Sequence, residues 1–389
     1  TGEVSGTGWP WSVAARETDV GVKYIPMQYA GRGQTYDVEG TNRNINVALP
    51  TLEARRAANS ATPDDPDELP GTADVGAQDS YSGEEGRGHL WDSALRAKIP
   101  VRNYGFYIDG ARYDPDSPSP IPVLRDPAQS NTMVAYPSDP ALIGITDPYF
   151  RSFDLKLPDF WREREWEREF ASQVKEKNMP ALTLVRFMMD HTGDFEHATD
   201  GVNTPEVQVA DNDYAVGRLV QRIASSAYRD STLIFIIEDD AQDGPDHVDA
   251  HRSTAYIVGP YVKQGAVVST RYSTVNLLRT IEDILGIEPL SMFDAYQRPM
   301  TDVFDLKQTA WGFHATPSAA LFRTNLPLPG KRTKGAGLEP RFALAHDASY
   351  WAAATRGYDW TREDRIDSAA YNRVLWEGLK GDRTYPVAR

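Results

Sequence analysis

The sequence contains no cysteine and no long apolar run, and these two absences narrow its chemistry. Without cysteine, the 389-residue chain forms no disulfide and no thiolate metal site. Any metal must therefore be bound by oxygen and nitrogen ligands. No apolar run approaches the roughly 18–20 residues of a membrane span, so we expect no stable membrane insertion. The absence of cysteine also fits an exported bacterial protein, and we expect a periplasmic or secreted location.

Positive charge is also scarce. The 41 Lys and Arg residues face 56 Asp and Glu residues, which gives a formal charge of −15. Binding to nucleic acid requires a basic face, so we expect no nucleic-acid partner. A bound cation would still attract a small anionic substrate.

The chain begins with Thr-Gly-Glu and has no initiator Met or signal-like apolar segment at its start. This beginning is typical of a mature or clipped product. We therefore expect an upstream segment of the same precursor as a partner.

A predicted strand followed by metal-type ligands dominates residues 233–252. The apolar run from Leu233 to Ile237 predicts a strand buried on both faces. Ligands bind beyond the carboxyl ends of strands in open α/β sheets, so this position favours a metal or catalytic site. The alternative is an acidic, solvated loop. The carboxylate and imidazole side chains that follow the strand are Glu238, Asp239, Asp240, Asp243, Asp246, His247, Asp249 and His251.

A second predicted strand, 181–189, ends in the same way at Asp190 and His191. We expect both side chains as metal ligands, although His191 is equally well explained as a structural hydrogen-bond donor. An amphipathic helix over 211–228 connects the two strands. This βαβ pattern predicts parallel strands with a right-handed crossover.

The other expected elements flank this unit. A glycine-rich turn around Ser5 precedes a helix from about Ser12, and the turn resembles an anion cradle in which Ser5 is a candidate nucleophile. The alternative for Ser5 is a plain Gly/Ser turn. Strands are expected at 101–108 and 254–262, and helices at 90–98, 160–177, 275–285 and 363–380. Residues 25–90 and 110–150 are rich in Pro, Gly and Asp and predict long loops.

The ligand types suit divalent metals. Carboxylates with imidazoles and no thiolate fit Zn²⁺, Mn²⁺, Fe or Ca²⁺, as one or two ions. Paired ions stabilise both the attacking and the leaving oxygen of a displacement at phosphorus. Arg252 is either a guanidinium that binds a phosphate oxygen or a surface ion-pair partner. The candidate ligands for such a site are Asp190, His191, Asp239, Asp240, His247 and His251.

The segment EDDAQDGPDHV resembles the phosphoesterase family of acid phosphatases and phospholipase C enzymes, within the alkaline phosphatase superfamily. Asp239 and Asp240 match that family's metal-binding Asp-Glu pair, and 246–248 match its Asp-His-Val. Ser5 matches the nucleophile of a bacterial subgroup. The chain departs from the pattern at position 194, where Asp replaces His, and it has no acidic-Asn strand end before Ser5.

The resemblance implies an α/β fold with a mostly parallel sheet sandwiched by helices, long Pro/Gly-rich loops and a C-terminal helical extension. We expect a catalytic domain over 1–304 and a C-terminal segment over 305–389 that packs on it. The implied function is a metal-dependent phosphoesterase that hydrolyses phosphate mono- or diesters through a phosphoseryl intermediate. The alternatives are a sulfatase or phospholipase C-type hydrolase of the same superfamily, and a non-catalytic metal-stabilised binding protein.

Overall fold

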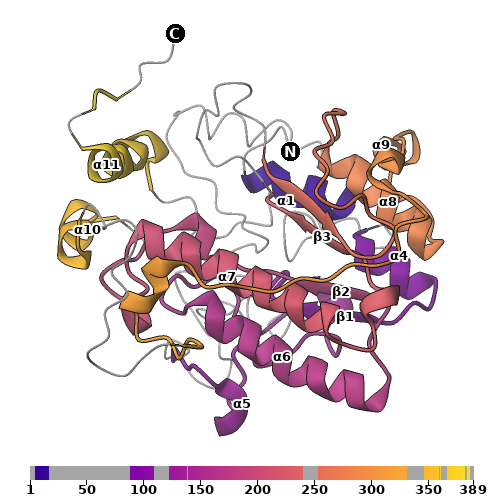
Figure 1. Ribbon diagram of the computed structural model, residues 1–389, viewed down its shortest axis with the longest axis horizontal. Helices are drawn as coiled ribbons and strands as arrows, with labels where there is room; N and C mark the ends of the chain where they lie inside the picture. Colours follow the sequence, from indigo (N-terminus) through magenta and orange to yellow (C-terminus); the bar gives the residue numbers. More distant parts are fainter. Residues whose placement is uncertain are drawn as a thin grey trace, which may run out of the picture.

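The structure is a computed structural model with an α/β architecture (Figure 1). Two short strand pairs lie between two groups of helices. Within the part of the chain that the structure describes, no helix is both long and apolar enough to cross a membrane. The described residues are 5–16, 88–108, 122–137, 139–239, 253–330, 346–358, 360, 366–381 and 383–385.

All four predicted strands are present, each shorter than its apolar run. Strand β1 (Val101–Tyr104) pairs in parallel with β2 (Leu182–Val185). Strand β3 (Ile234–Ile237) pairs antiparallel with β4 (Ala255–Val258). Among the described residues, β2 and β3 share no hydrogen-bonded ladder, so the parallel arrangement expected of a larger sheet is found in the β1–β2 pair alone.

Helices α6 (Asp159–Glu176) and α7 (Pro205–Ala224) cover one face of both strand pairs. Their buried side chains pack against Tyr104 of β1, Val185 of β2 and Ile236 of β3. The contact with the strands is apolar, whereas buried charges lie between the two helices, where Arg218 of α7 pairs with Glu163 and Glu167 of α6.

The other face is covered by α1 (Ser5–Ala14), α4 (Leu90–Arg96) and α8 (Thr274–Leu285). Leu182 and Leu184 of β2 point into this second cluster. On β3, alternate residues also divide between two clusters, because Phe235 and Ile237 pack with α8 while Ile234 and Ile236 pack under α7. Every residue of β3 nevertheless remains partly exposed, so the strand is less buried than its sequence predicts.

Two helix starts differ from the sequence prediction. Helix α1 begins at Ser5 and not at about Ser12, so the glycine-rich stretch is itself helical. Helix α7 begins at Pro205, before the predicted 211, because Thr204 accepts a hydrogen bond from the main chain at N3 and proline suits the first helical position. The predicted end of α8 is confirmed: Gly286 has φ 68° and caps the helix in the left-handed conformation.

The C-terminal part contributes α10 (Ala348–Ala354) and α11 (Ser368–Lys380). They meet where the Trp351 ring lies against Gly378; a Cβ at Gly378 would stand 2.1 Å from that ring. Helix α10 was not predicted. Two further helices in the described residues are short, α5 (Pro127–Ser130) and α9 (Met292–Ala295).

Candidate active site

The end of β2 is held by a buried carboxylate from α6. Asp159 accepts hydrogen bonds from the main-chain N–H groups of Met188 (3.0 Å) and Met189 (2.8 Å). It also forms a 2.9 Å ion pair with Arg162, and both side chains are fully buried. Asp190 lies in the short 3₁₀ turn Met189–His191, and these hydrogen bonds fix the main chain at the start of that turn.

Asn212 connects this buried carboxylate to Asp190. Its amide Nδ2 lies 3.1 Å from Asp159 Oδ2 and 3.1 Å from Asp190 Oδ1. Asn212 is on α7, so a helix on one face of the strands orients the carboxylate at their end.

The electrostatic environment of Asp190 is strongly acidic. The pKa of Asp190 is raised to about 7, mainly by desolvation from the surrounding protein and further by the negative charges of Asp159 and Glu238. The Asp190 side chain nevertheless remains exposed to solvent. The Arg186 charge opposes this shift. Glu238 directly follows β3, so the ends of β2 and β3 lie close enough for their carboxylates to repel each other. Converging carboxylates of this kind attract a cation.

Comparison with known protein families finds a match that covers this region of the chain. Residues 148–288 match the model of the Phosphoesterase family. The match supports a phosphoesterase family assignment for this part of the chain. The comparison with curated proteins gives no match. The match supports hydrolysis of phosphoester bonds. The matched residues include Asp190, Glu238 and strands β2, β3 and β4.

The predicted site residues of this phosphoesterase region are only partly within the described residues. Asp190 and Asp239 are described, and Asp239 directly follows Glu238. The His191 ring packs edge-on against Phe153, with centroids 5.0 Å apart, and its Nδ1 lies 3.3 Å from the Thr192 carbonyl. Asp240, His247, His251 and Arg252 lie outside the described residues.

Ser5, which lies before the matched region, is described in its backbone alone. It is the first residue of α1, so its main chain is at the positive end of the helix. That position is compatible with the anion cradle predicted for this segment, while the position of the Ser5 hydroxyl lies outside the described atoms.

The loop that follows Asp190 has an unusual backbone. Thr192 (φ 53°), Gly193 (φ 138°) and Asp194 (φ 46°) are consecutive residues with positive φ. The Gln208 side chain holds Gly193 on both sides, accepting from its N–H (2.7 Å) and donating to its carbonyl (2.6 Å). A Cβ at Gly193 would lie 2.0 Å from the Trp360 ring. Strained backbone conformations of this kind are common next to functional sites, where contacts with the surrounding structure hold them in place.

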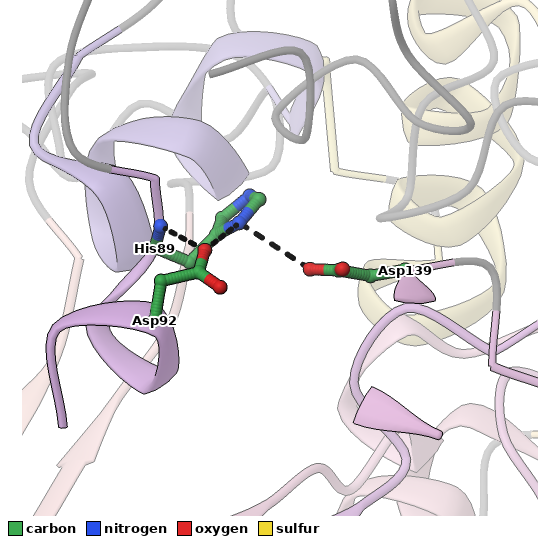
Figure 2. A group of neighbouring side chains, drawn as sticks. All are labelled: His89, Asp92 and Asp139. Atoms are coloured by element: carbon green, nitrogen blue, oxygen red, sulfur yellow. Dashed lines mark hydrogen bonds and ion pairs between the residues drawn. The ribbon is translucent and has the colours of Figure 1, made fainter. Parts of the chain in front are cut away.

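A second group of ligand-type side chains lies outside the matched region and was not predicted. His89, Asp92 and Asp139 each place one donor atom within 4.8 Å of the others (Figure 2). All three are buried, with exposures of 1%, 2% and 6%. Desolvation raises the pKa of Asp139, and the neighbouring His89 opposes this shift. The only sequence signal for this group is the three-residue spacing of His89 and Asp92 at the start of a predicted helix. Nothing in the sequence connects these two residues to Asp139.

Proposed function

We propose that the chain is a metal-dependent phosphoesterase that hydrolyses mono- or diesters of phosphate. The observation that carries the proposal is the electrostatic contact between Asp190 and Glu238 at the ends of β2 and β3, within the phosphoesterase region. The negative charge of Glu238 contributes to the raised pKa of Asp190, and such an acidic strand end favours a bound divalent cation.

The cation would be bound by Asp190 together with carboxylates and imidazoles of the segment after β3. Bound there, a divalent ion would supply Lewis-acid stabilisation of negative charge on the phosphoryl oxygens. Asp159 and Asn212 would maintain the orientation of Asp190, as outer hydrogen-bond partners do for metal ligands. The other proposed ligands are His191, Asp239, Asp240, His247 and His251.

Ser5 is the proposed nucleophile. Its oxygen would form a bond to phosphorus while the bond to the ester oxygen breaks, and the leaving alcohol would take up a proton. Water would then attack phosphorus in the seryl intermediate, releasing phosphate from a monoester substrate or a phosphate monoester from a diester, and restoring the Ser5 hydroxyl. Arg252 would bind a non-bridging phosphate oxygen with its guanidinium group.

Hydrolysis of an aryl phosphate, an aryl phosphodiester and an aryl sulfate by the full chain tests the proposal. We expect phosphate ester hydrolysis that chelation abolishes and Zn²⁺ or Mn²⁺ restores. Asp190→Asn should lower kcat/KM at least about 100-fold, because it removes a charged ligand beside the reacting group. Asp213→Asn changes an exposed carboxylate one residue after Asn212 and provides the matched control.

The reaction intermediate is tested separately. Acid quenching with ³²P-labelled substrate should leave label on the wild-type chain and none on Ser5→Ala. Unchanged hydrolysis by Ser5→Ala would reject Ser5 as the nucleophile. Preferential sulfate hydrolysis would favour a sulfatase, and absence of any hydrolysis in the metal-loaded wild type would favour a non-catalytic metal-binding protein.

A further inference from the structure

We infer that His89, Asp92 and Asp139 form a second divalent cation site, separate from the proposed catalytic one. The three residues come from two distant segments. His89 is the N-cap of α4, and Asp92 lies in its first turn. Asp139 caps a different short turn, 47 positions after Asp92. A shared ion would connect these segments beside the β1 end of the sheet, where Tyr107 packs against His89.

The distances between donor atoms favour a metal over a hydrogen bond. His89 Nδ1 lies 3.4 Å from Asp92 Oδ2 and 3.5 Å from Asp139 Oδ2. Both separations exceed the 2.7–3.2 Å range of N–H···O hydrogen bonds. They agree with the edge of a tetrahedral site, which is about 3.4 Å for bonds of about 2.1 Å to N and O ligands. Figure 2 shows both contacts meeting at the same ring nitrogen.

The surroundings orient the two carboxylates toward this nitrogen. The His89 main-chain N–H donates to Asp92 Oδ2 at 2.8 Å, and the Trp91 indole N–H donates to Asp139 Oδ2 at 2.8 Å. The Ala141 N–H binds the other Asp139 oxygen at 2.8 Å. Outer donors of this kind hold metal-ligating carboxylates in place.

The charge and burial of the group also favour a bound cation. Two carboxylates more than nine-tenths buried face one imidazole nitrogen, and His89 Nε2, also buried, has no hydrogen-bond partner. A cation between the three donors would compensate both negative charges where water does not reach. One nitrogen and two oxygen donors suit Zn²⁺ or Mn²⁺ better than Ca²⁺, which needs six to eight oxygens.

The site is tested by counting ions. The metal-free full chain is titrated with Zn²⁺, and bound zinc is measured by mass spectrometry after removal of free ion. We expect His89→Gln and Asp139→Asn to bind one ion fewer per chain than wild type. Asp126→Asn is the matched control, because it changes another helix-capping aspartate that lies outside the group. Equal zinc content in all four proteins would overturn the inference.

A second measurement covers the possibility that these variants fail to fold. In the Asp190→Asn protein, whose proposed catalytic site is disabled, a Zn²⁺ concentration 100 times the dissociation constant should raise Tm by roughly 3 °C. The absence of any shift, or an equal shift in the double variant Asp139→Asn/Asp190→Asn, would overturn the inference. Neither measurement uses hydrolysis, so failure here is distinct from failure of the proposed phosphoesterase activity.

Discussion

Replacement of Glu282 by glutamine should change how the stability of the protein depends on pH. Glu282 on α8 and Asp294 on α9 are both fully buried, and neither Glu282 oxygen has a hydrogen-bond donor. Asp294 already accepts from the main-chain N–H groups of Leu290 (2.6 Å) and Ser291 (2.8 Å). Desolvation, reinforced by Asp294, raises the pKa of Glu282 to about 9, from an ordinary value of 4.5.

The sign and size of the effect follow from this shift. The folded state holds the Glu282 proton more tightly than the unfolded state, so the stabilisation is fully present below pH 4.5 and is lost as pH rises toward 9. Each pH unit in this window lowers the free energy of unfolding by up to about 1.4 kcal/mol. Between pH 5 and pH 8 the loss amounts to about 2–4 kcal/mol, since structural relaxation reduces the ideal value.

Urea unfolding of wild type and Glu282→Gln at pH 5 and pH 8 measures this difference. Glutamine has no titrating group, so the variant should lose about 2–4 kcal/mol less than wild type over the interval. Glu377→Gln, which changes an exposed glutamate on α11, should follow the wild type. Parallel pH profiles for wild type and Glu282→Gln would refute the reasoning. Other buried carboxyls affect all three proteins equally and cancel in the comparison.

Three further substitutions test other contacts. Asn212→Ala should weaken divalent metal binding about 10–100-fold in a titration, because Asp190 loses its orienting amide; an unchanged dissociation constant would contradict that role. Gly378→Ala should cost about 1–3 kcal/mol in urea unfolding, because the new methyl group collides with Trp351; unaltered stability would show that α11 does not pack as described. Arg162→Met should cost about 3–5 kcal/mol in the same assay, because it leaves a buried ion pair broken, and a loss below 1 kcal/mol would argue against that burial.

Local sequence patterns determined the four strands and the long helices α6, α7 and α8. The short, mainly apolar runs around 182–185, 234–237 and 255–258 indicate strands. Periodic apolar residues specify α6, α7 and α8 in the same way. The end of α8 follows from Gly286 alone, since that position requires a left-handed backbone. The ligand-rich strand ends are equally local signals.

Local patterns did not determine where several elements begin. The glycine-rich start of α1 favours a turn by propensity, yet the structure places Ser5 in the helix. Packing of Val13 and Ala15 into the cluster shared with α4 and α8 outweighs that propensity. Pairing between strands is also non-local, so the antiparallel β3–β4 pair was not anticipated.

Contacts between distant residues were decided by tertiary structure alone. Asp159 and Asn212 are 53 positions apart, and they meet at Asp190 because α6 and α7 cover the same face of the strands. His89 and Asp139 are 50 positions apart, and they meet because the folded chain brings the starts of two separate helical turns together. The sequence by itself thus established the residue types and strand ends that make a phosphoesterase-like site plausible. Only the fold could bring partners together across long separations, because side-chain proximity depends on packing and not on order along the chain.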